Sequence, residues 1–161
     1  MPEMHRRGET NRVFDAVKLI LPEIDTARVI AREYFIDVES VIEVDSARMN
    51  GKPSVIQFLS RAILRNAIYH SKRAYFKERR KVNCHVFIER DFLKLVVTND
   101  GKMVGGESTG LGQALKTAEG LLETNPGDLQ HREFVVREAN ENLDGPAFIE
   151  TDRVEATLSW P

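Results

Sequence analysis

Residues 54–75 read SVIQFLSRAILRNAIYHSKRAY and predict one long helix. Its inward positions recur at steps of three and four, which is the spacing of a single helical face. They are Val55, Leu59, Ala62, Ile63, Asn66, Ala67 and His70. Asn66 needs partners in this apolar stripe, because an unpaired buried polar group costs about 1–3 kcal/mol. It is therefore either a core amide bonded to backbone or an oxygen ligand for Mg²⁺, an ion that binds oxygen atoms of the protein and of substrate phosphates together.

Two alternating runs follow this helix and predict a β-hairpin. Apolar residues fall at every second position of 82–88 and of 93–97, and the short segment 89–91 connects the two runs. Counting by twos from Leu93 places Asn99 on the inward face, directly before Gly101. Asn99-Asp100-Gly101 is typical of a simple turn, yet an amide there also suits an adenine ring that approaches the glycine backbone.

A glycine-rich segment, 101–110, precedes another helical stripe at 111–123. The helix opens with Ser108-Thr109-Gly110-Leu111-Gly112, in which Ser108 or Thr109 is a candidate cap. Glycines at a helix N-terminus expose backbone N–H groups, and the helix dipole favours an anion there. A capped helix start is also common without any ligand, so this segment alone decides nothing.

The remaining segments complete a sheet with helices. A loose tail of residues 1–9 precedes a helix from Asn11 that Pro22 should end near Leu21. The other expected elements are a helix over 25–35 capped by Asp25, a strand over 38–44, a turn over 49–53, and strands over 133–138 and 153–160. This order predicts an α+β fold, a two-layer α/β sandwich whose mixed, mostly antiparallel sheet carries helices on one face. We divide the chain into an N-terminal tail and helix, 1–24, and a domain, 25–161.

Composition indicates one ordinary domain in a reducing compartment. The chain has 161 residues, 42% hydrophobic and 30% charged, with a net charge of −2 and a single cysteine, Cys84. These values exclude a global basic field, a disulfide framework and a cysteine cluster for zinc. No apolar run approaches the ~18 residues of a membrane helix. We expect a cytoplasmic protein without direct membrane contact, or the soluble part of a membrane-associated one.

The three segments together resemble the ATP-binding family that includes gyrase, Hsp90, histidine kinases and MutL. The helix motif at 62–70, Asn99-x-Gly101 and Thr109-Gly110-Leu111-Gly112 stand in the family's order. They are most similar to sensor histidine kinases with a very short ATP lid, over roughly residues 25–161. The resemblance implies a Bergerat-type fold that binds ATP and Mg²⁺. It assigns the metal to Asn66, the phosphates to His70, Thr109, Gly110, Leu111 and Gly112, and adenine to Asn99 and Gly101.

The resemblance implies a catalytic domain that donates the γ-phosphoryl group to a histidine on a separate module, which then serves a response regulator. Asn99 replaces the family's usual aspartate, Met103 and Ser108 replace glycines, and Ala62 stands where hydrolysing relatives carry a glutamate. Water needs a positioned base, so Ala62 argues against self-contained hydrolysis. The departures leave two alternatives open: a degenerate nucleotide- or protein-binding module without phosphotransfer, and a serine kinase of the anti-sigma type.

No histidine of this chain has the setting of the acceptor, a helical histidine followed by an acid. His5 lies in the tail, His85 in a strand and His131 in a loop-like segment. The resemblance therefore implies a partner, a histidine-bearing dimerisation module. A homodimer would form through that missing module or through the N-terminal helix, which is otherwise a packing helix.

A basic cluster follows the long helix and suggests a rival function. It comprises Lys72, Arg73, Lys77, Arg79, Arg80 and Lys81, interleaved with Tyr75 and Phe76. Such a cluster is able to bind nucleic acid. Glu78 interrupts it and the chain is slightly acidic, which favours a solvated helix end and no nucleic-acid partner. In the kinase interpretation Lys72 or Arg73 would lie near the triphosphate.

Overall fold

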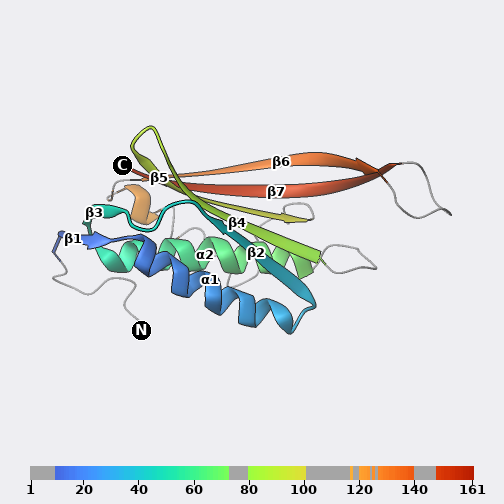
Figure 1. Ribbon diagram of the computed structural model, residues 1–161, viewed down its shortest axis with the longest axis horizontal. Coiled ribbons are helices and arrows are strands. Elements are labelled where there is room, and N and C mark those ends of the chain that lie inside the picture. The colour runs from blue at the N-terminus through green and yellow to red at the C-terminus, as the bar shows by residue number, and fades with distance from the viewer. Residues whose placement is uncertain are drawn as a thin grey trace.

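The protein is described by a computed structural model (Figure 1). It describes the backbone of residues 10–72, 80–100, 117, 120–123, 125, 127–139 and 148–161.

A five-stranded sheet forms one layer of the molecule. Its strands lie in the order β2-β4-β5-β7-β6, with β2 and β4 parallel and every other neighbouring pair antiparallel. The strands are β2 (Ile36–Ile42), β4 (Arg80–Glu89), β5 (Phe92–Asp100), β6 (Asp128–Ala139) and β7 (Phe148–Trp160). The sheet is therefore mixed and mostly antiparallel, as the sequence predicted.

Two helices, α1 (Val17–Arg32) and α2 (Pro53–Lys72), cover one face of this sheet (Figure 1). They pack against each other, and α2 also packs against β5 near the centre of the sheet. Leu59 of α2, Leu95 of β5 and Trp160 of β7 are fully buried between the layers. The two-layer α+β sandwich with helices on one face is confirmed.

The first residues of the described chain form a strand where we expected a helix. β1 (Arg12–Asp15) pairs antiparallel with β3 (Arg48–Gly51), so the turn expected over 49–53 was also wrong. Asp15 explains both differences. Its Oδ1 accepts the N–H of Val17 at 3.1 Å and that of Ala47 at 3.0 Å. The carboxylate thus binds the first residue of α1. It also fixes Ala47, which directly precedes β3, beside the start of that helix.

Pro22 lies inside α1 and does not end it. A proline within a helix removes one hydrogen bond and costs about 3 kcal/mol or more. Here Ile20 before it and Ile24 and Ala27 after it are all buried on the same side of the helix. Burying a side chain of this size stabilises by about 1.5–3 kcal/mol, which offsets the loss. The two helices expected on either side of Pro22 are one helix that crosses residue 24, while the division of the chain into domains there stays a prediction.

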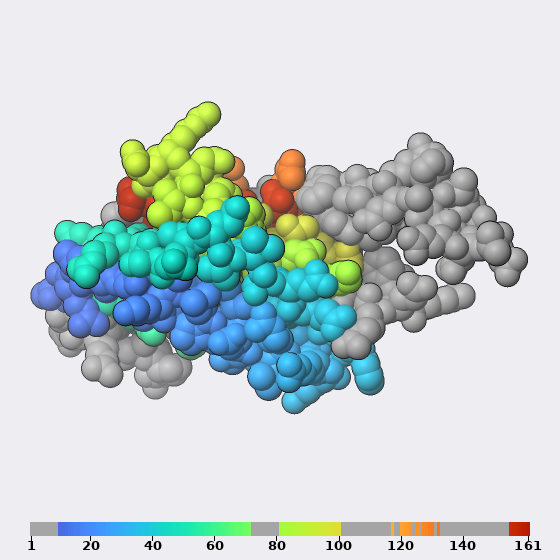
Figure 2. Space-filling view, in the orientation of Figure 1, coloured from blue at the N-terminus to red at the C-terminus, as the bar shows by residue number. Residues whose placement is uncertain are grey.

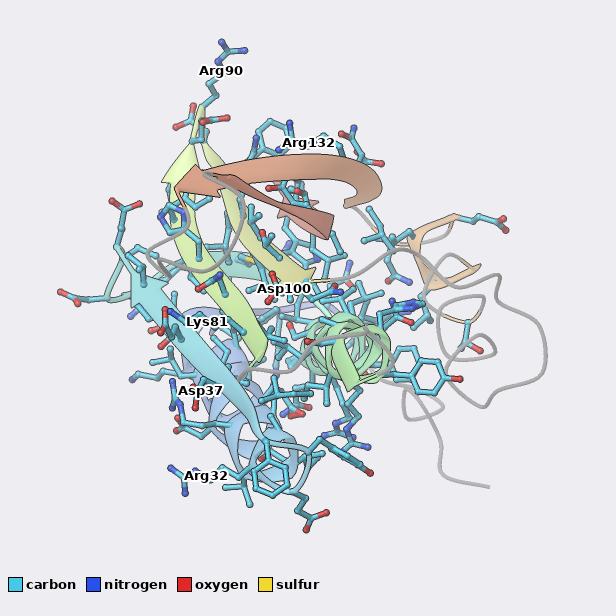
Figure 3. The ribbon with its side chains drawn as sticks, turned by 90° about the vertical axis from the view of Figure 1, so that its right-hand side faces the viewer. Arg32, Asp37, Lys81, Arg90, Asp100 and Arg132 are labelled. Atoms are coloured by element: carbon cyan, nitrogen blue, oxygen red, sulfur yellow. The ribbon has the colours of Figure 1, made fainter. Side chains whose placement is uncertain are left out.

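The hairpin of β4 and β5 is confirmed with its inward alternation. Arg90 and Asp91 connect the strands with φ of 52° and 65°. Left-handed conformations at both central residues are those of the tight turn that matches strand twist. This turn projects from the body of the molecule, with Arg90 at its tip (Figures 2 and 3).

The second hairpin is longer than expected. Strands predicted over 133–138 and 153–160 occupy 128–139 and 148–160. β7 pairs with β5 only from Arg153 onward, opposite Asp100. Beyond that point β6 and β7 pair with each other and, among the described strands, with no other, and they extend past the sheet (Figure 1). We call this extension, residues 135–139 and 148–152, the β6–β7 arm.

No helix in the part of the chain that the structure describes is long and apolar enough to cross a membrane. Of the helix expected over 111–123, Thr117 and residues 120–123 are described and helical. The rest of that segment lies outside the described residues.

Candidate nucleotide site

The second half of α2 buries polar side chains in the interface with the sheet. Asn66 is 6% exposed and His70 is 5% exposed. They are four residues apart, so they share a face and lie about 6 Å apart along the helix axis. The His70 ring stacks edge-on against Tyr69, with 5.7 Å between ring centroids. α2 thus brings an amide and an imidazole together at its C-terminal end.

Asn99 lies on the inward face of β5, as the alternation predicted, and is 3% exposed. Its backbone register partners are Val82 in β4 and Val154 in β7, which places it in the middle of the sheet. The Nδ2 group donates a hydrogen bond to the carbonyl oxygen of Asp100 at 2.9 Å. A carboxamide has two N–H groups and an acceptor oxygen, so this one bond orients the Asn99 side chain without exhausting it.

The fold brings these two segments to the same end of the helix–sheet interface. α2 packs on β5, and both elements end on the same side of the molecule (Figures 1 and 3). The strand end is held in place by Asp100, whose Oδ2 accepts the backbone N–H of Lys81 at 3.2 Å. Asn66, His70 and Asn99, separate in the sequence, therefore belong to one end of the interface.

The polar side chains at this end suit a cation that is bound by the protein and a substrate together. Among the described residues there is no group of three or more His, Cys, Asp or Glu side chains that could hold a metal by themselves. Asn66 offers an uncharged oxygen, a hard donor of the type that Mg²⁺ accepts. Mg²⁺ usually takes one or two protein ligands and completes its shell with phosphates and water. The described residues thus fit a Mg²⁺ ion that arrives with a nucleotide.

Several predicted site residues lie outside the described residues. They are Gly101, Thr109, Gly110, Leu111 and Gly112, together with the departures Met103 and Ser108. Their assignment to adenine and phosphates stays a prediction. Of the basic cluster, the side chain of Lys81 is described; it is exposed, and its Nζ lies 3.5 Å from Glu39.

Ala62 is buried one turn before Asn66, on the same face of α2. A carboxylate at this position would project toward the same end of the interface as Asn66. Alanine has no group that accepts a proton, so α2 supplies no general base here.

Cys84 and His85 carry reactive groups, but both lie outside the candidate site. Burial raises the pKa of the Cys84 thiol to about 12, so the thiolate is negligible at neutral pH. His85 lies on the other face of the sheet, where its Nε2 contacts Glu43 Oε2 and its ring packs on Phe87. Neither residue contributes to the candidate site.

A pocket at the opposite end of α2 was not anticipated. Its volume is about 370 Å³, and β1, β3, the first turn of α2 and the C-terminal Trp160 and Pro161 line it. Val55 in its wall precedes Asn66 by eleven residues, or about 16 Å of helix. The pocket is therefore separate from the candidate site. Sequence patterns missed it because it depends on the β1–β3 pairing, which no local pattern indicated.

No family model and no curated protein matches this chain. Several solved structures match it. The catalytic domain of histidine kinase ThkA, free of nucleotide, matches with a TM-score of 0.62 and 16% identity, covering 94% of this chain and 96% of that one. The chain has the fold of a histidine kinase catalytic domain. The mycobacterial sensor histidine kinase MprB matches with a TM-score of 0.62 and 16% identity, covering 94% and 98%.

The likeness to histidine kinase domains extends over nearly the whole chain. The cytoplasmic segment of histidine kinase QseC aligns over 96% of this chain and 80% of its own, with a TM-score of 0.61 and 16% identity. ThkA also matches in its complex with the response regulator TrrA, with a TM-score of 0.60 and 15% identity. That match covers 94% of this chain and 42% of the ThkA chain. At such low identity the likeness establishes the fold, and the roles of individual residues need their own argument.

Proposed function

We propose that this chain is an ATP- and Mg²⁺-binding histidine kinase catalytic domain, which donates the γ-phosphoryl group to a histidine on a separate module. The observation that carries the proposal is the pair of buried amides, Asn66 and Asn99, at one end of the α2–β5 interface. A fold shared with histidine kinase catalytic domains supports it. Buried amides are costly unless they are bonded, and a bound nucleotide would bond both.

In this proposal each residue has a separate task. Asn66 offers its amide oxygen to Mg²⁺, and His70, one turn further along α2, interacts with the phosphates. Asn99, held by its bond to the Asp100 carbonyl, presents its remaining polar atoms to adenine, and Gly101 lets the base approach the backbone. Thr109, Gly110, Leu111 and Gly112 enclose the phosphates with backbone N–H groups. Mg²⁺, when bound, neutralises phosphate charge in the reaction.

Because Ala62 cannot act as a base, the site suits phosphoryl transfer to a histidine better than hydrolysis of ATP by water. Water must lose a proton to a positioned base as it attacks. An imidazole nitrogen is already nucleophilic when neutral, and phosphoryl transfer depends mainly on positioning and charge neutralisation. The protein would therefore hold ATP with little turnover until an acceptor histidine arrives.

We propose two partners and a location on the same basis. The acceptor is a histidine-bearing dimerisation module, since none of the four histidines of this chain is followed by an acid, as the acceptor histidine is expected to be. The next partner is a response regulator, as in the ThkA–TrrA complex among the similar structures. A cytoplasmic location is supported by the match to the cytoplasmic segment of QseC.

Phosphotransfer from ATP labelled at the γ-position tests the proposal. The chain is mixed with Mg²⁺ and a panel of isolated histidine kinase dimerisation modules, and the label on each module is followed by acid and alkali stability. Acid-labile, alkali-stable label marks phosphohistidine and supports the proposal. Acid-stable label on a serine would indicate a serine kinase instead. Nucleotide binding without transfer to any acceptor would leave a degenerate binding module as the function.

A further inference from the structure

The two edges of the sheet differ in how open they are to another strand. At the β2 edge, Arg28 of α1 reaches over the strand: its Nε donates to the Val38 carbonyl oxygen at 3.2 Å and its Nη2 contacts Ser40 Oγ at 3.1 Å. An edge carbonyl that is already bonded is a poor template for strand addition. At the other edge β6 runs for 12 residues, and among the described residues no strand lies beyond it.

The sequence of β6 is complementary to itself when reversed. Residues 132–138 read Arg-Glu-Phe-Val-Val-Arg-Glu. In an antiparallel pair of identical strands, opposite residues have numbers with a constant sum. If Val135 lies on the two-fold axis, Arg132 stands opposite Glu138 of the second copy, and Glu133 opposite Arg137. Phe134 then stands opposite Val136, so each position of 132–138 faces a favourable partner. Arg132 also lies 3.2 Å from Glu155 within the chain, so Glu138 of the second copy would join an existing ion pair.

Backbone geometry limits the other registers. Residues of one strand alternate between pointing their N–H and C=O groups to one neighbour and to the other, so opposite residues must have the same parity. A two-fold axis must therefore pass through a residue. An axis at Phe134 sets Glu133 against Val135 and His131 against Arg137, and an axis at Val136 sets Phe134 against Glu138. Of these three registers, the one at Val135 matches opposite charges.

The β6–β7 arm gives a reason for this pairing. Beyond Arg153 the arm is only two strands wide. An isolated two-stranded ribbon is marginally stable in water, and three or more strands are needed for independent stability. Val135 lies at the base of the arm, opposite Asp152 in β7. With Val135 on the axis, residues 135–139 of each arm pair with residues 131–135 of the other copy, where β6 is already paired with β7 and β7 with β5. Each arm thus becomes part of a wider sheet.

We propose that this chain forms a homodimer by antiparallel pairing of β6 with β6 of a second copy, with Val135 on the two-fold axis. The interface joins the two five-stranded sheets into one. It is isologous, because the same strand is used on both sides, and it closes without leaving a further copy of the same edge. It is separate from any dimer made through a helical module, and it does not depend on the proposed nucleotide site.

Charge reversal tests the register. Glu133→Arg with Glu138→Arg places like charges opposite Arg137 and Arg132 at four positions of the dimer, while their partners within the chain are Val154 and Ile149. Sedimentation velocity of the full chain over a concentration series should give a dimer whose dissociation constant rises at least tenfold in this variant. Glu33→Arg with Glu123→Arg, both at exposed positions off the sheet edge, makes the same change in net charge and should leave the constant unaltered.

Disulfide trapping gives a second readout that does not depend on destabilising the protein. Opposite Cα atoms of an antiparallel pair lie about 4.5–5.5 Å apart, within the range of a disulfide. Val135→Cys should therefore form a covalent dimer under mild oxidation. Glu133→Cys should not, because the two copies of residue 133 lie four residues out of register, or about 13 Å apart. The native Cys84 is buried and should not compete.

The two experiments together decide the proposal. A dimer that the double reversal weakens, with cross-linking at 135 and not at 133, supports it. A chain that stays monomeric over the whole concentration series, or a dimer that ignores the charge reversal and does not cross-link at 135, overturns it. Circular dichroism of each variant separates a lost interface from a lost fold.

Discussion

The two ends of the α2–β5 interface are built from the same two elements but differ in chemistry. Toward the N-terminus of α2 and the hairpin end of β5, most buried residues are apolar, among them Leu59, Leu93 and Leu95, and Ser60 is the buried polar residue that the structure describes in this half of α2. Toward the C-terminal ends, Asn66, His70 and Asn99 are buried among apolar neighbours such as Ala67 and Val97. The first end closes the core. The second end buries polar groups, which are costly there unless they are hydrogen-bonded, and in the proposed function a bound nucleotide supplies such bonds.

The largest expected effect belongs to the apolar end. Leu59 is fully buried, so Leu59→Ala should lower the free energy of unfolding by about 2–5 kcal/mol through lost burial and a cavity. Urea titration measures this loss. Nucleotide affinity at low temperature, where the variant remains folded, should be unchanged. A loss of affinity in the folded variant would mean that the two ends are not functionally separate.

Asn66→Ala should show the reverse pattern. Mg²⁺-dependent ATP affinity should fall on the order of 100-fold, equivalent to about 2.7 kcal/mol, while the free energy of unfolding changes by less than about 1 kcal/mol. Calorimetric titration with ATP in the presence of Mg²⁺ or of EDTA measures the difference. Asn83→Ala, the same change on the other face of the sheet, is the control. Unchanged affinity in Asn66→Ala would remove this residue from the metal role.

Asn99→Asp should have a smaller effect on binding. A carboxylate is a pure and charged acceptor, so it should bond the exocyclic amine of adenine more strongly than an amide does. We expect a gain in affinity for adenine nucleotides of roughly fivefold, about 1 kcal/mol. Comparing ATP with an analogue that lacks the amine measures it. If the substitution weakens ATP binding, Asn99 does not face the amine in the way proposed.

The smallest effect concerns Asp15, at the apolar end. The backbone N–H of Ala47 holds the pKa of Asp15 below its ordinary value of 3.8. A carboxyl group with a lowered pKa in the folded state stabilises the fold above its unfolded pKa, and this contribution is lost as the pH falls through the folded pKa. Asp15→Asn should therefore be slightly less stable than the wild type at pH 7, and the difference should shrink as the pH falls below 3.8 and disappear below the folded-state pKa of Asp15. A difference that persists in acid would contradict the charge-based explanation.

Local patterns predicted the parts of the fold that depend on neighbouring residues. The stripe of α2 and the alternation of β4 and β5 correctly placed Asn66, His70 and Asn99 on buried faces. The strand expected over 38–44 corresponds to β2, but residues 12–15 and 48–51 were mispredicted because Asp15 takes one of its partners from Ala47, 32 positions away. The helix end predicted at Pro22 was wrong because buried apolar residues on both sides of Pro22 stabilise α1 through it.

The order of the strands and the meeting of α2 with β5 came from the structure. The alternating charges of β6 can be read from the sequence, but they indicate strand pairing only because β6 is the edge strand of the described sheet. For the candidate site, sequence predicted which side chains are buried, and structure added that they share one end of the interface.

We propose that the buried amides at one end of this interface bind ATP and Mg²⁺. The most direct test of this proposal is a nucleotide titration followed through the side-chain amide resonances of Asn66 and Asn99 by NMR, each assigned by its alanine variant. We predict that ATP alone shifts the Asn99 resonances, and that the Asn66 resonances shift fully only after Mg²⁺ is added. Resonances of both residues that remain in place at millimolar ATP and Mg²⁺ would contradict the account.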